Sequence, residues 1–424
     1  MVRMFGLKMS IGITLVASFS IIFILGSAII GSGILGKATR EIFSFGPLAH
    51  DANGHTNILL LGVGGEKEEG GYLSDSIMIL SINPNNPSVS FLSLPRDLFL
   101  NSRVGNRKIN EIYAVAKKKY GERRGIEVIK DAVADFTGVE IDYGAVIDFH
   151  VFREVIDALG GVDIFVSHDI DDPFFPNGNY GYKTFVVRTG LQHFDGETAL
   201  EYARSRKTSS DYDRARRQQD LILAMKEKAE ALSFLTDFGK LTDFFQMYRK
   251  YVNTDLGLTQ VIALAKIAMA IDYSNAISAV LNDDPMEMGG LLYTPAKEFY
   301  GGQFVLLPED VKDTQFFMEL VLIHPDVLLE GAQISVLNGS GIEGKASSVA
   351  SRLRRLGFHV IEVGNYNSDT PAVETFIRDF SPQKDLETKD VLEELLDVRI
   401  VPAAEESPAS PESILDLQVI LGTG

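Results

Sequence analysis

The segment LSDSIMILSINPNNPSVSFLSLPRD, residues Leu73–Asp97, contains two apolar runs of strand length on either side of a turn-forming sequence. The runs, Ser76–Ile82 and Val89–Leu94, are bounded by Asn and Pro residues, as strands usually are. The Pro after the second run cannot continue a strand ladder because it has no N–H group. We therefore predict two strands of one sheet, with polar residues at their ends.

Charged side chains stand at the ends of these strands. Asp75 precedes the first strand, and Arg96 and Asp97 follow the second. Polar groups at strand ends are the usual position of a ligand site in an α/β protein. Lys108, which begins the helical pattern KINEIYA, is a further candidate. Each of these charges taken alone is also compatible with an ordinary surface turn.

The same alternation of elements continues around this segment. Further strands are predicted at Asn57–Gly62, Ala145–Phe149, Val162–Val166 and Phe304–Leu307, and helices at Gly125–Phe136 and Val151–Leu159. The segment HDIDDPFFPNGN, 168–179, is predicted to be a loop because Asp, Pro, Gly and Asn dominate it. Two or three more helices are expected between Gln219 and about Ala270. This alternation favours a mixed α/β fold with a central sheet covered by helices.

A second domain is predicted near the C-terminus. From Ile334 the sequence indicates a strand, a glycine turn, a helix and another strand, followed by a helix around Asp385–Leu396 and a closing strand at Leu417–Leu421. About 90 residues suffice for a small α/β domain. The predicted layout is a cytoplasmic N-terminus (1–8), a membrane anchor (9–36), a stalk (37–54), a main domain (55–310), a linker helix (311–330) and the C-terminal domain (331–424).

The anchor is predicted from the absence of charge between Met9 and Gly36. A membrane-spanning helix needs roughly 20 apolar residues, more than a secretory signal usually has. We predict an uncleaved signal anchor over about Ile11–Ser32, with a cleaved signal peptide as the alternative. Positive charges before and after the segment are balanced, so they do not decide its orientation.

The charge balance of the chain limits its partners. A formal net charge of −18 argues against general binding to nucleic acid, which requires a basic surface. The absence of Cys excludes disulfides and cysteine nucleophiles. Within this acidic chain, however, the stretch from Arg204 to Arg217 contains six cationic side chains. Any anion site must therefore be local.

Helical periodicity suggests how this basic stretch is arranged. In a helix beginning near Asp211, Arg214 and Gln218 share the apolar face that contains Leu221 and Met225, whereas Arg216 lies opposite. Inward arginines need an anionic partner because an unpaired buried charge is costly. That partner is either a carboxylate or, for several converging arginines, a phosphate group. If their segment is extended, Arg204 and Arg206 share a face as well.

Six ordered motifs identify a family resemblance. They are SDSIMILSINP, SLPRD, KINEIYA, DALGGVDI, LEYARSR and DYDRARRQQ. In order and spacing they resemble the LytR-CpsA-Psr family of membrane-anchored bacterial envelope proteins, over roughly Asn57–Pro308. The final part, with VLNGSG and LGFHV, is similar to the LytR C-terminal domain.

The resemblance implies a glycopolymer phosphotransferase, with a pyrophosphatase side activity. Such an enzyme passes the glycan phosphate of a polyprenyl-pyrophosphate-linked glycan to a peptidoglycan hydroxyl, which places the main domain on the extracytoplasmic side of a single membrane span. By the resemblance, Asp75 would hold Mg²⁺ and Asp97 would brace Arg96. The residues implied in pyrophosphate binding are Arg96, Arg204, Arg206, Arg214 and Gln218, with Lys108 and Arg217 nearby.

Two positions depart from the family pattern, and two alternatives follow. Gly64 stands where the family usually has a second Asp ligand, and Leu73 stands where it usually has an Arg. A non-catalytic or merely hydrolytic polyprenyl-pyrophosphate-binding protein is therefore one alternative. The other is a dinucleotide site in the C-terminal domain. A G-x-G-x-x-G pattern (Gly339, Gly341, Gly344) followed by Glu362 would form it, although a packing turn is favoured.

Overall fold

The computed structural model describes residues 48–65, 71–85, 88–176, 181–205, 217, 220–221, 224–225, 228, 252–257, 259–261, 263–264, 267, 271, 276–366, 372–403 and 415–423. The predicted anchor, Met9–Gly36, lies outside this part of the chain. The described residues form two compact units. One contains residues up to 89, 93–276 and 303–305, and the other contains 90–92, 277–302 and the residues after 305.

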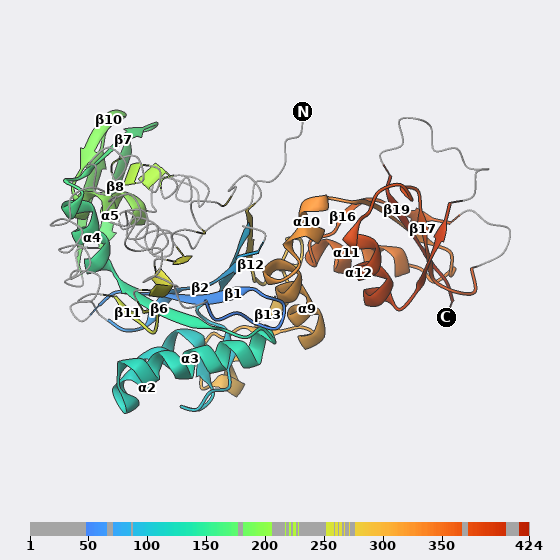
Figure 1. The fold of residues 1–424 in the computed structure, drawn as a ribbon, viewed down its shortest axis with the longest axis horizontal. Coiled ribbons are helices and arrows are strands. Elements are labelled where there is room, and N and C mark those ends of the chain that lie inside the picture. Colours follow the sequence, from blue (N-terminus) through green and yellow to red (C-terminus); the bar gives the residue numbers. More distant parts are fainter. Residues whose placement is uncertain are drawn as a thin grey trace, which may run out of the picture. The chain divides into compact units, whose positions relative to one another are not determined.

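The chain forms a six-stranded mixed sheet with strand order β11-β6-β1-β2-β3-β12 (Figure 1). Its strands are β1 (Thr56–Val63), β2 (Ser74–Asn83), β3 (Ser88–Leu94), β6 (Tyr143–Asp148), β11 (Asn253–Thr254) and β12 (Ile277–Val280). Strand β1 pairs antiparallel with β2 and parallel with β6. Every residue of β1 is buried, as expected for a strand covered on both faces.

A β-bulge interrupts the pairing of β1 with β2. Gly62 is opposite Ser76, whereas Val63 is opposite Ser74, so that Asp75 is the extra residue. Bulges change the direction of a side chain and are common beside functional sites. Asp75 is exposed although most of β2 is buried.

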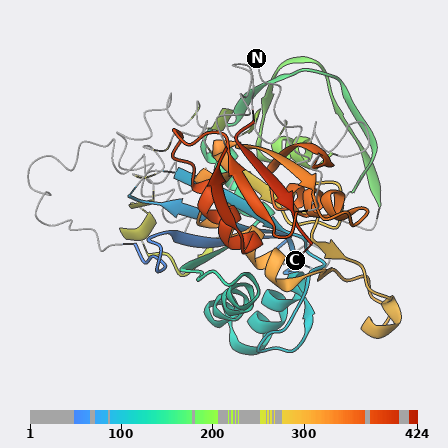
Figure 2. The same ribbon diagram turned by 90° about the vertical axis from the view of Figure 1, so that its right-hand side faces the viewer.

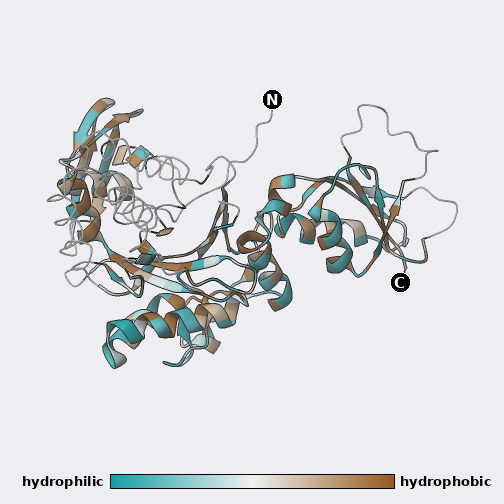
Figure 3. Cartoon of the chain, viewed as in Figure 1, coloured by the Kyte–Doolittle hydropathy of each residue, from teal (hydrophilic) through white to brown (hydrophobic). Residues whose placement is uncertain are grey.

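Two helices cover one face of this sheet (Figure 1). They are α2 (Ile109–Tyr120) and α3 (Glu122–Thr137), and both alternate between hydrophobic and hydrophilic surfaces in Figure 3. Their buried residues recur at helical spacing, among them Ile109, Ile112, Tyr113 and Ala116 in α2. The helices approach closely at Gly125, where a Cβ atom would lie 3.1 Å from the backbone N of Lys117.

The loop predicted at 168–179 is wrong over residues 170–176, because they form a β-strand. Residues 177–179 lie outside the described part of the chain. Strands β7 (Val162–Val166) and β8 (Ile170–Pro176) pair antiparallel with β10 (Gly190–Phe194) and β9 (Tyr182–Val187), respectively. Together these four strands form one long two-stranded arm, the β-arm, which Figure 2 shows as a curved green ribbon. The inward side chains of Ile170, Asp172 and Phe175 are buried, and this burial outweighs the turn preference of Asp and Pro.

Two short helices accompany the β-arm. Helix α4 (Phe149–Ala158) and helix α5 (Gly196–Arg204) contact each other and are joined by an ion pair between Arg153 and Glu197, with an Nη1–Oε2 distance of 3.0 Å. Asp195 caps α5 by accepting a hydrogen bond from the backbone N–H of Thr198.

The second unit contains a five-stranded sheet of order β16-β15-β19-β17-β18. Its elements are β15 (Gln333–Asn338), α11 (Lys345–Arg355), β16 (His359–Asn365), β17 (Phe376–Asp379), α12 (Glu387–Leu396), β18 (Arg399–Pro402) and β19 (Leu417–Leu421). Two helices, α9 (Val311–Leu322) and α10 (Pro325–Glu330), occupy the predicted linker. The strand predicted at Phe304–Leu307 is reduced to a two-residue strand, β14 (Leu307–Pro308), which pairs with β13 (Leu292–Tyr293).

Within the described ranges, none of the helices combines the length and the apolar character that crossing a membrane requires.

Candidate phosphate-binding site

Four charged side chains form a continuous chain of ion pairs where β2 begins and β3 ends. Arg96 Nη1 lies 3.0 Å from Asp75 Oδ1, and Arg96 Nε lies 3.6 Å from Asp97 Oδ2. Lys108 Nζ lies 2.8 Å from the other oxygen of Asp97. We call Asp75, Arg96, Asp97 and Lys108 the charged tetrad. The structure thus brings together four of the residues predicted from the sequence, and Asp97 contacts Arg96 as the resemblance implies.

Local backbone structure positions the tetrad. Strand β3 ends before Pro95, and the N–H of Leu98 donates to the Pro95 carbonyl across a tight turn. Two short strands, β4 (Phe99–Leu100) and β5 (Arg107–Lys108), then pair so that Phe99 is opposite Lys108. This hairpin returns Lys108 to the carboxylate of Asp97.

The exposure of the tetrad distinguishes its members. The side chains of Arg96 and Asp75 are 58% and 55% exposed, whereas those of Lys108 and Asp97 are 19% and 22% exposed. Arg96 can therefore present its remaining N–H groups to a ligand. Asp97 contacts Arg96, and Lys108 in turn contacts Asp97. Two carboxylates and two cations have no net charge. Further positive charge is needed to attract a pyrophosphate, and the basic stretch or a metal ion would supply it.

A second cluster lies at the C-terminal end of α5, where Arg204 is the last helical residue. The guanidinium carbon of Arg204 is 5.8 Å from the ring centroid of Phe175, in strand β8. The next residue, Ser205, is buried and donates a hydrogen bond from Oγ to Asp172 Oδ2 at 2.9 Å. Lys183 of β9 forms an ion pair with Glu201 of α5. The β-arm is therefore fastened to the helix that presents Arg204.

Arg217 is buried, and its hydrogen bonds reach the backbone at the end of α5. Its Nε donates to the Tyr202 carbonyl at 3.0 Å, and its Nη2 donates to the Ser205 carbonyl at 2.6 Å. These carbonyls belong to the last turn of α5 and to the residue after it, where intrahelical partners run out. The contacts give Arg217 a positioning role for the cluster. Its contact with pyrophosphate stays a prediction.

Three predicted site residues, Arg206, Arg214 and Gln218, lie outside the described residues, as does Asp211, the expected start of their helix. The sequence reasoning missed Asp172, Lys183, Glu201 and Ser205, which hold the β-arm against α5. Asp172 carried no usable signal because its surroundings resemble a loop.

The donors present near the tetrad fit a magnesium ion only in part. Mg²⁺ prefers oxygen ligands and is often held by one or two carboxylates together with substrate phosphates. Asp75 supplies one accessible carboxylate, and Gly64 supplies none. The next residue, Gly65, has no side chain either, and its φ of +91° disfavours any other residue at that position. Among the described residues there is no group of three or more His, Cys, Asp or Glu side chains that could hold a metal ion.

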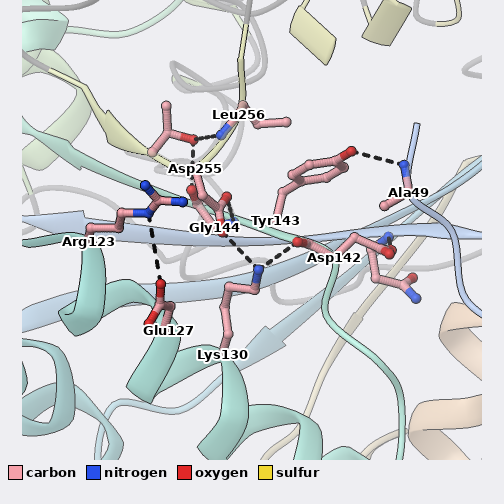
Figure 4. Close-up of polar contacts among 11 residues, drawn as sticks. Ala49, Arg123, Glu127, Lys130, Asp142, Tyr143, Gly144, Asp255 and Leu256 are labelled. Carbon is pink, nitrogen blue, oxygen red and sulfur yellow. Dashed lines mark hydrogen bonds and ion pairs between the residues drawn. The ribbon is translucent and has the colours of Figure 1, made fainter. Parts of the chain in front are cut away.

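Another charged network lies where β6 begins (Figure 4), at the end of the sheet away from the charged tetrad. Lys130 Nζ donates to Asp255 Oδ2 at 2.8 Å and to the Asp142 carbonyl at 2.5 Å. Asp255 Oδ1 also accepts from the Gly144 N–H at 2.7 Å, and Asp142 Oδ2 accepts from the Asn57 N–H at 2.8 Å. The network connects α3, β6, β1 and the segment after β11, and its groups are engaged with one another.

Burial affects the titration of this network. Desolvation raises the pKa of the Asp142 carboxyl above its ordinary value of 3.8, although the N–H of Asn57 and the charge of Lys130 act in the opposite direction. This end of the sheet is therefore suited to holding elements together rather than to binding a further anion.

The glycine turn of the second unit has the geometry of a packing turn. A Cβ atom on Gly339 would lie 2.9 Å from the Cβ of Ala372 and 3.1 Å from the Leu421 carbonyl oxygen. Glu362, the candidate ribose ligand, accepts a hydrogen bond from Ser335 Oγ at 2.7 Å. Close packing thus explains the glycine, and a structural contact explains the carboxylate.

A cleft of about 940 Å³ in the same unit is also unsuited to a phosphate ligand. Its charged lining consists of Glu374, Asp390, Glu393, Glu394, Asp397 and Arg399. Five carboxylates against one guanidinium repel a dinucleotide.

Comparison with known proteins identifies the family of the chain. The model of the LytR_cpsA_psr family matches residues 35–294, and that of the LytR cell envelope-related transcriptional attenuator (LytR_C) matches 331–424. The chain belongs to the LytR_cpsA_psr family.

Named relatives of the chain act in cell-wall assembly. The polyisoprenyl-teichoic acid–peptidoglycan teichoic acid transferase TagU of Bacillus mycoides is 29% identical over 296 residues, which are 64% of this chain and 87% of that protein. The cell wall biosynthesis protein LcpA of Corynebacterium glutamicum is 26% identical over 351 residues, 74% of this chain and 64% of that protein. The crystal structure of B. subtilis TagV aligns with 64% of this chain and 98% of its own, at 22% identity and a TM-score of 0.43.

Proposed function

We propose that this chain is a glycopolymer transferase that moves a glycan phosphate from a polyprenyl-pyrophosphate carrier to a hydroxyl group of peptidoglycan. The observation that carries the proposal is the charged tetrad, in which an exposed arginine is held between two carboxylates at the ends of two adjacent strands. Membership of the family, with a teichoic acid transferase among the relatives, supports the same reaction.

The reaction needs little covalent chemistry from the protein. The acceptor hydroxyl oxygen forms a bond to the phosphorus that carries the glycan, the hydroxyl proton passes to solvent, and the bond from this phosphorus to the bridging oxygen breaks. Polyprenyl phosphate leaves with the bonding electrons. Such a transfer depends on alignment and on neutralising the charge of the leaving phosphate. Arg96 and Arg204 are the described residues that would contact the pyrophosphate. Lys108, Asp97 and Arg217 would hold them in place.

Magnesium is part of this proposal. Asp75 would hold the ion together with oxygen atoms of the pyrophosphate. When bound, the ion would neutralise phosphate charge. Because Asp75 forms an ion pair with Arg96, a cation on Asp75 would also compete for that carboxylate and leave more of the guanidinium to the substrate. This coupling would compensate for the missing net charge of the tetrad.

We also propose that the chain is anchored by Met9–Gly36 with its main domain on the extracytoplasmic side, where peptidoglycan is found. The support is the uncharged length of this segment. Protease added to intact spheroplasts should remove the main domain. Complete protection of that domain would contradict this topology and the choice of acceptor.

The test of the proposed reaction compares Arg204, which lies beside β8, with Arg188, which lies between β9 and β10. Full-length protein in detergent is given a polyprenyl-pyrophosphate-linked glycan and peptidoglycan, and both released polyprenyl phosphate and polymer attached to peptidoglycan are measured. Arg204→Ala should reduce both about 100-fold or more, as loss of a preorganised charge does. Arg188→Ala is the matched control, because Arg188 is 60% exposed in the β-arm and pairs with Asp169.

A binding or hydrolytic function is the second candidate, and the side chains at positions 64 and 73 favour it. Release of polyprenyl phosphate without attachment to peptidoglycan would identify a hydrolase. Binding without release would identify a carrier-binding protein. In either case the double change Gly64→Asp and Leu73→Arg should restore transfer if only these two ligands are missing.

A further inference from the structure

Strand β8 contains a bulge that places two residues on its inner face. Asp172 is opposite Phe185, and Phe175 is opposite Lys183, so β8 has one more residue than β9 over this stretch. In a regular strand, side chains three positions apart point to opposite faces. Because of the extra residue, Asp172 and Phe175 are instead both buried, with 2% and 3% of their surface exposed. The bulge therefore presents a carboxylate and an aromatic ring on the same face of the β-arm.

Both inward residues contact the end of α5, where Arg204 is found. Asp172 Oδ2 accepts a hydrogen bond from Ser205 Oγ at 2.9 Å, and the ring centroid of Phe175 lies 5.8 Å from the guanidinium carbon of Arg204. The second distance is within the range of a cation–π contact. Asp172 Oδ1 also accepts from the N–H of Phe174 at 3.2 Å, inside the bulge. Strand β8 thus contacts both the side chain of Arg204 and the residue that follows it.

Every polar group of Ser205 has a partner. Its N–H donates to the Glu201 carbonyl at 2.9 Å, its carbonyl accepts from Arg217 Nη2 at 2.6 Å, and its hydroxyl donates to Asp172. Ser205 has extended backbone angles, φ −58° and ψ 134°, which end the helix directly after Arg204. Helix ends commonly fray, and a side chain in the last turn then loses its fixed direction. These contacts therefore hold the last turn of α5 in place.

The contact of Asp172 with Ser205 differs from the other contact between the β-arm and α5. The ion pair of Lys183 with Glu201 joins two side chains, and that of Lys183 is 44% exposed. Exposed ion pairs contribute little to stability. Asp172 and Ser205 are 2% and 1% exposed, and a hydrogen bond to a carboxylate is stronger than one between neutral groups. The buried contact is therefore the one suited to fixing the direction of Arg204.

Building on the proposed function, we propose that Asp172 is a positioning residue of the transfer site, which acts through Ser205 to aim the guanidinium of Arg204 at the pyrophosphate. Asp172 itself does not contact the substrate. A displaced guanidinium stabilises the charge of the leaving phosphate less, and a small displacement of a positioned group can remove much of the rate. The β-arm is thereby part of the framework that aligns the reacting groups.

The experiment measures release of polyprenyl phosphate by the full-length protein in detergent, from the same polyprenyl-pyrophosphate-linked glycan, per folded molecule. Ser205→Ala and Asp172→Ala should each reduce turnover about tenfold, because Arg204 loses its alignment. In a protein that already carries Arg204→Ala, the same two changes should reduce turnover by no more than about twofold, because the residue through which they act is gone. Independent contributions would multiply instead.

Hydrogen exchange gives a second readout that does not depend on activity. In Ser205→Ala and Asp172→Ala, the backbone amides at the end of α5 should exchange faster, while those of the β-sheet should not change. Glu197→Ala is the matched control from the same helix. Glu197 lies in the first turn of α5 and pairs with Arg153 at 3.0 Å, away from the last turn. This variant should keep normal turnover and normal exchange at the end of α5.

The outcomes separate a positioning role from a structural one. A further tenfold loss when Ser205→Ala or Asp172→Ala is added to Arg204→Ala would overturn the proposal, because the two residues would then act independently of Arg204. Normal turnover in both single variants would overturn it as well. If the wild type releases no polyprenyl phosphate, or if Arg204→Ala releases it normally, the proposed function fails and the positioning role fails with it. Faster exchange would then show only that Asp172 holds the end of α5.

Discussion

The two ends of the central sheet carry charged clusters of similar composition and different character. At one end, Lys130 and Asp255 are 15% and 20% exposed and are joined to backbone groups of neighbouring strands. At the other end, Arg96 and Asp75 are 58% and 55% exposed and stand on a bulge and a strand terminus. Residue type alone does not separate a structural network from a binding site. The two kinds of cluster differ in burial and in the number of internal partners. A buried ion depends on its partners, because removing one of them destabilises the fold.

The largest effect on stability is expected at Lys130. Lys130→Ala would leave the carboxylate of Asp255 without its cation in a mostly buried position, which should lower the free energy of unfolding by about 3 kcal/mol. Thermal and urea unfolding of the full-length protein measure this loss. Arg123→Ala is the control from the same helix, since Arg123 is 88% exposed and lies 3.9 Å from Glu127 (Figure 4). A loss at Arg123 as large as that at Lys130 would contradict the distinction by burial.

Arg217 is expected to have the next-largest effect, because it is buried and its hydrogen bonds hold the end of the helix that carries Arg204. Arg217→Ala removes two hydrogen bonds from a buried guanidinium to the end of α5, which should cost about 2 kcal/mol of stability. It should also reduce transfer, since Arg204 loses its support. Arg217→Lys keeps the charge but cannot reach both carbonyls in a fixed fork, so that it should recover stability only in part. Full recovery with Lys would show that charge, rather than geometry, matters at this position.

A smaller effect is expected at Asp142, with a defined dependence on pH. Because the pKa of Asp142 is raised in the folded protein, the folded state keeps this proton to higher pH than the unfolded state does. The carboxylate therefore reduces stability as the pH rises from 3.8 through the raised folded pKa. Asp142→Asn, whose amide oxygen can still accept from Asn57, should be as stable as the wild type or more stable at pH 7, by up to about 1 kcal/mol. Its advantage should disappear in acid. A loss of stability at pH 7 would show that the charge is needed.

Much of the main domain could be predicted because its strands are short apolar runs with clear boundaries. The run Asn57–Gly62 became β1, and Ser76–Ile82 became β2, each extended by one or two residues at either end. The charged tetrad could be predicted for the same reason, because its members flank predicted strands. Arg96 was singled out by its place after Pro95, and the structure confirms that it lies beside Asp75 and Asp97.

The features that could not be predicted depend on contacts between distant residues. Asp172 and Pro173 are typical of loops, yet β8 forms because Phe175 and Ile170 are buried and pair with β9. The contact of Lys130 with Asp255 spans 125 residues, and local periodicity cannot detect it. The backbone contacts of Arg217 likewise depend on where α5 ends, which was not predicted.

The most direct test measures transfer and stability together in two variants of the full-length protein, Arg96→Ala and Lys130→Ala. Arg96→Ala should reduce release of polyprenyl phosphate about 10²–10⁴-fold. It should change the free energy of unfolding by no more than about 0.5 kcal/mol, because an exposed ion pair contributes little to stability. Lys130→Ala should show the reverse pattern, with a large loss of stability and near-normal turnover of the molecules that remain folded. Normal turnover in Arg96→Ala would contradict the assignment of the charged tetrad to the transfer site.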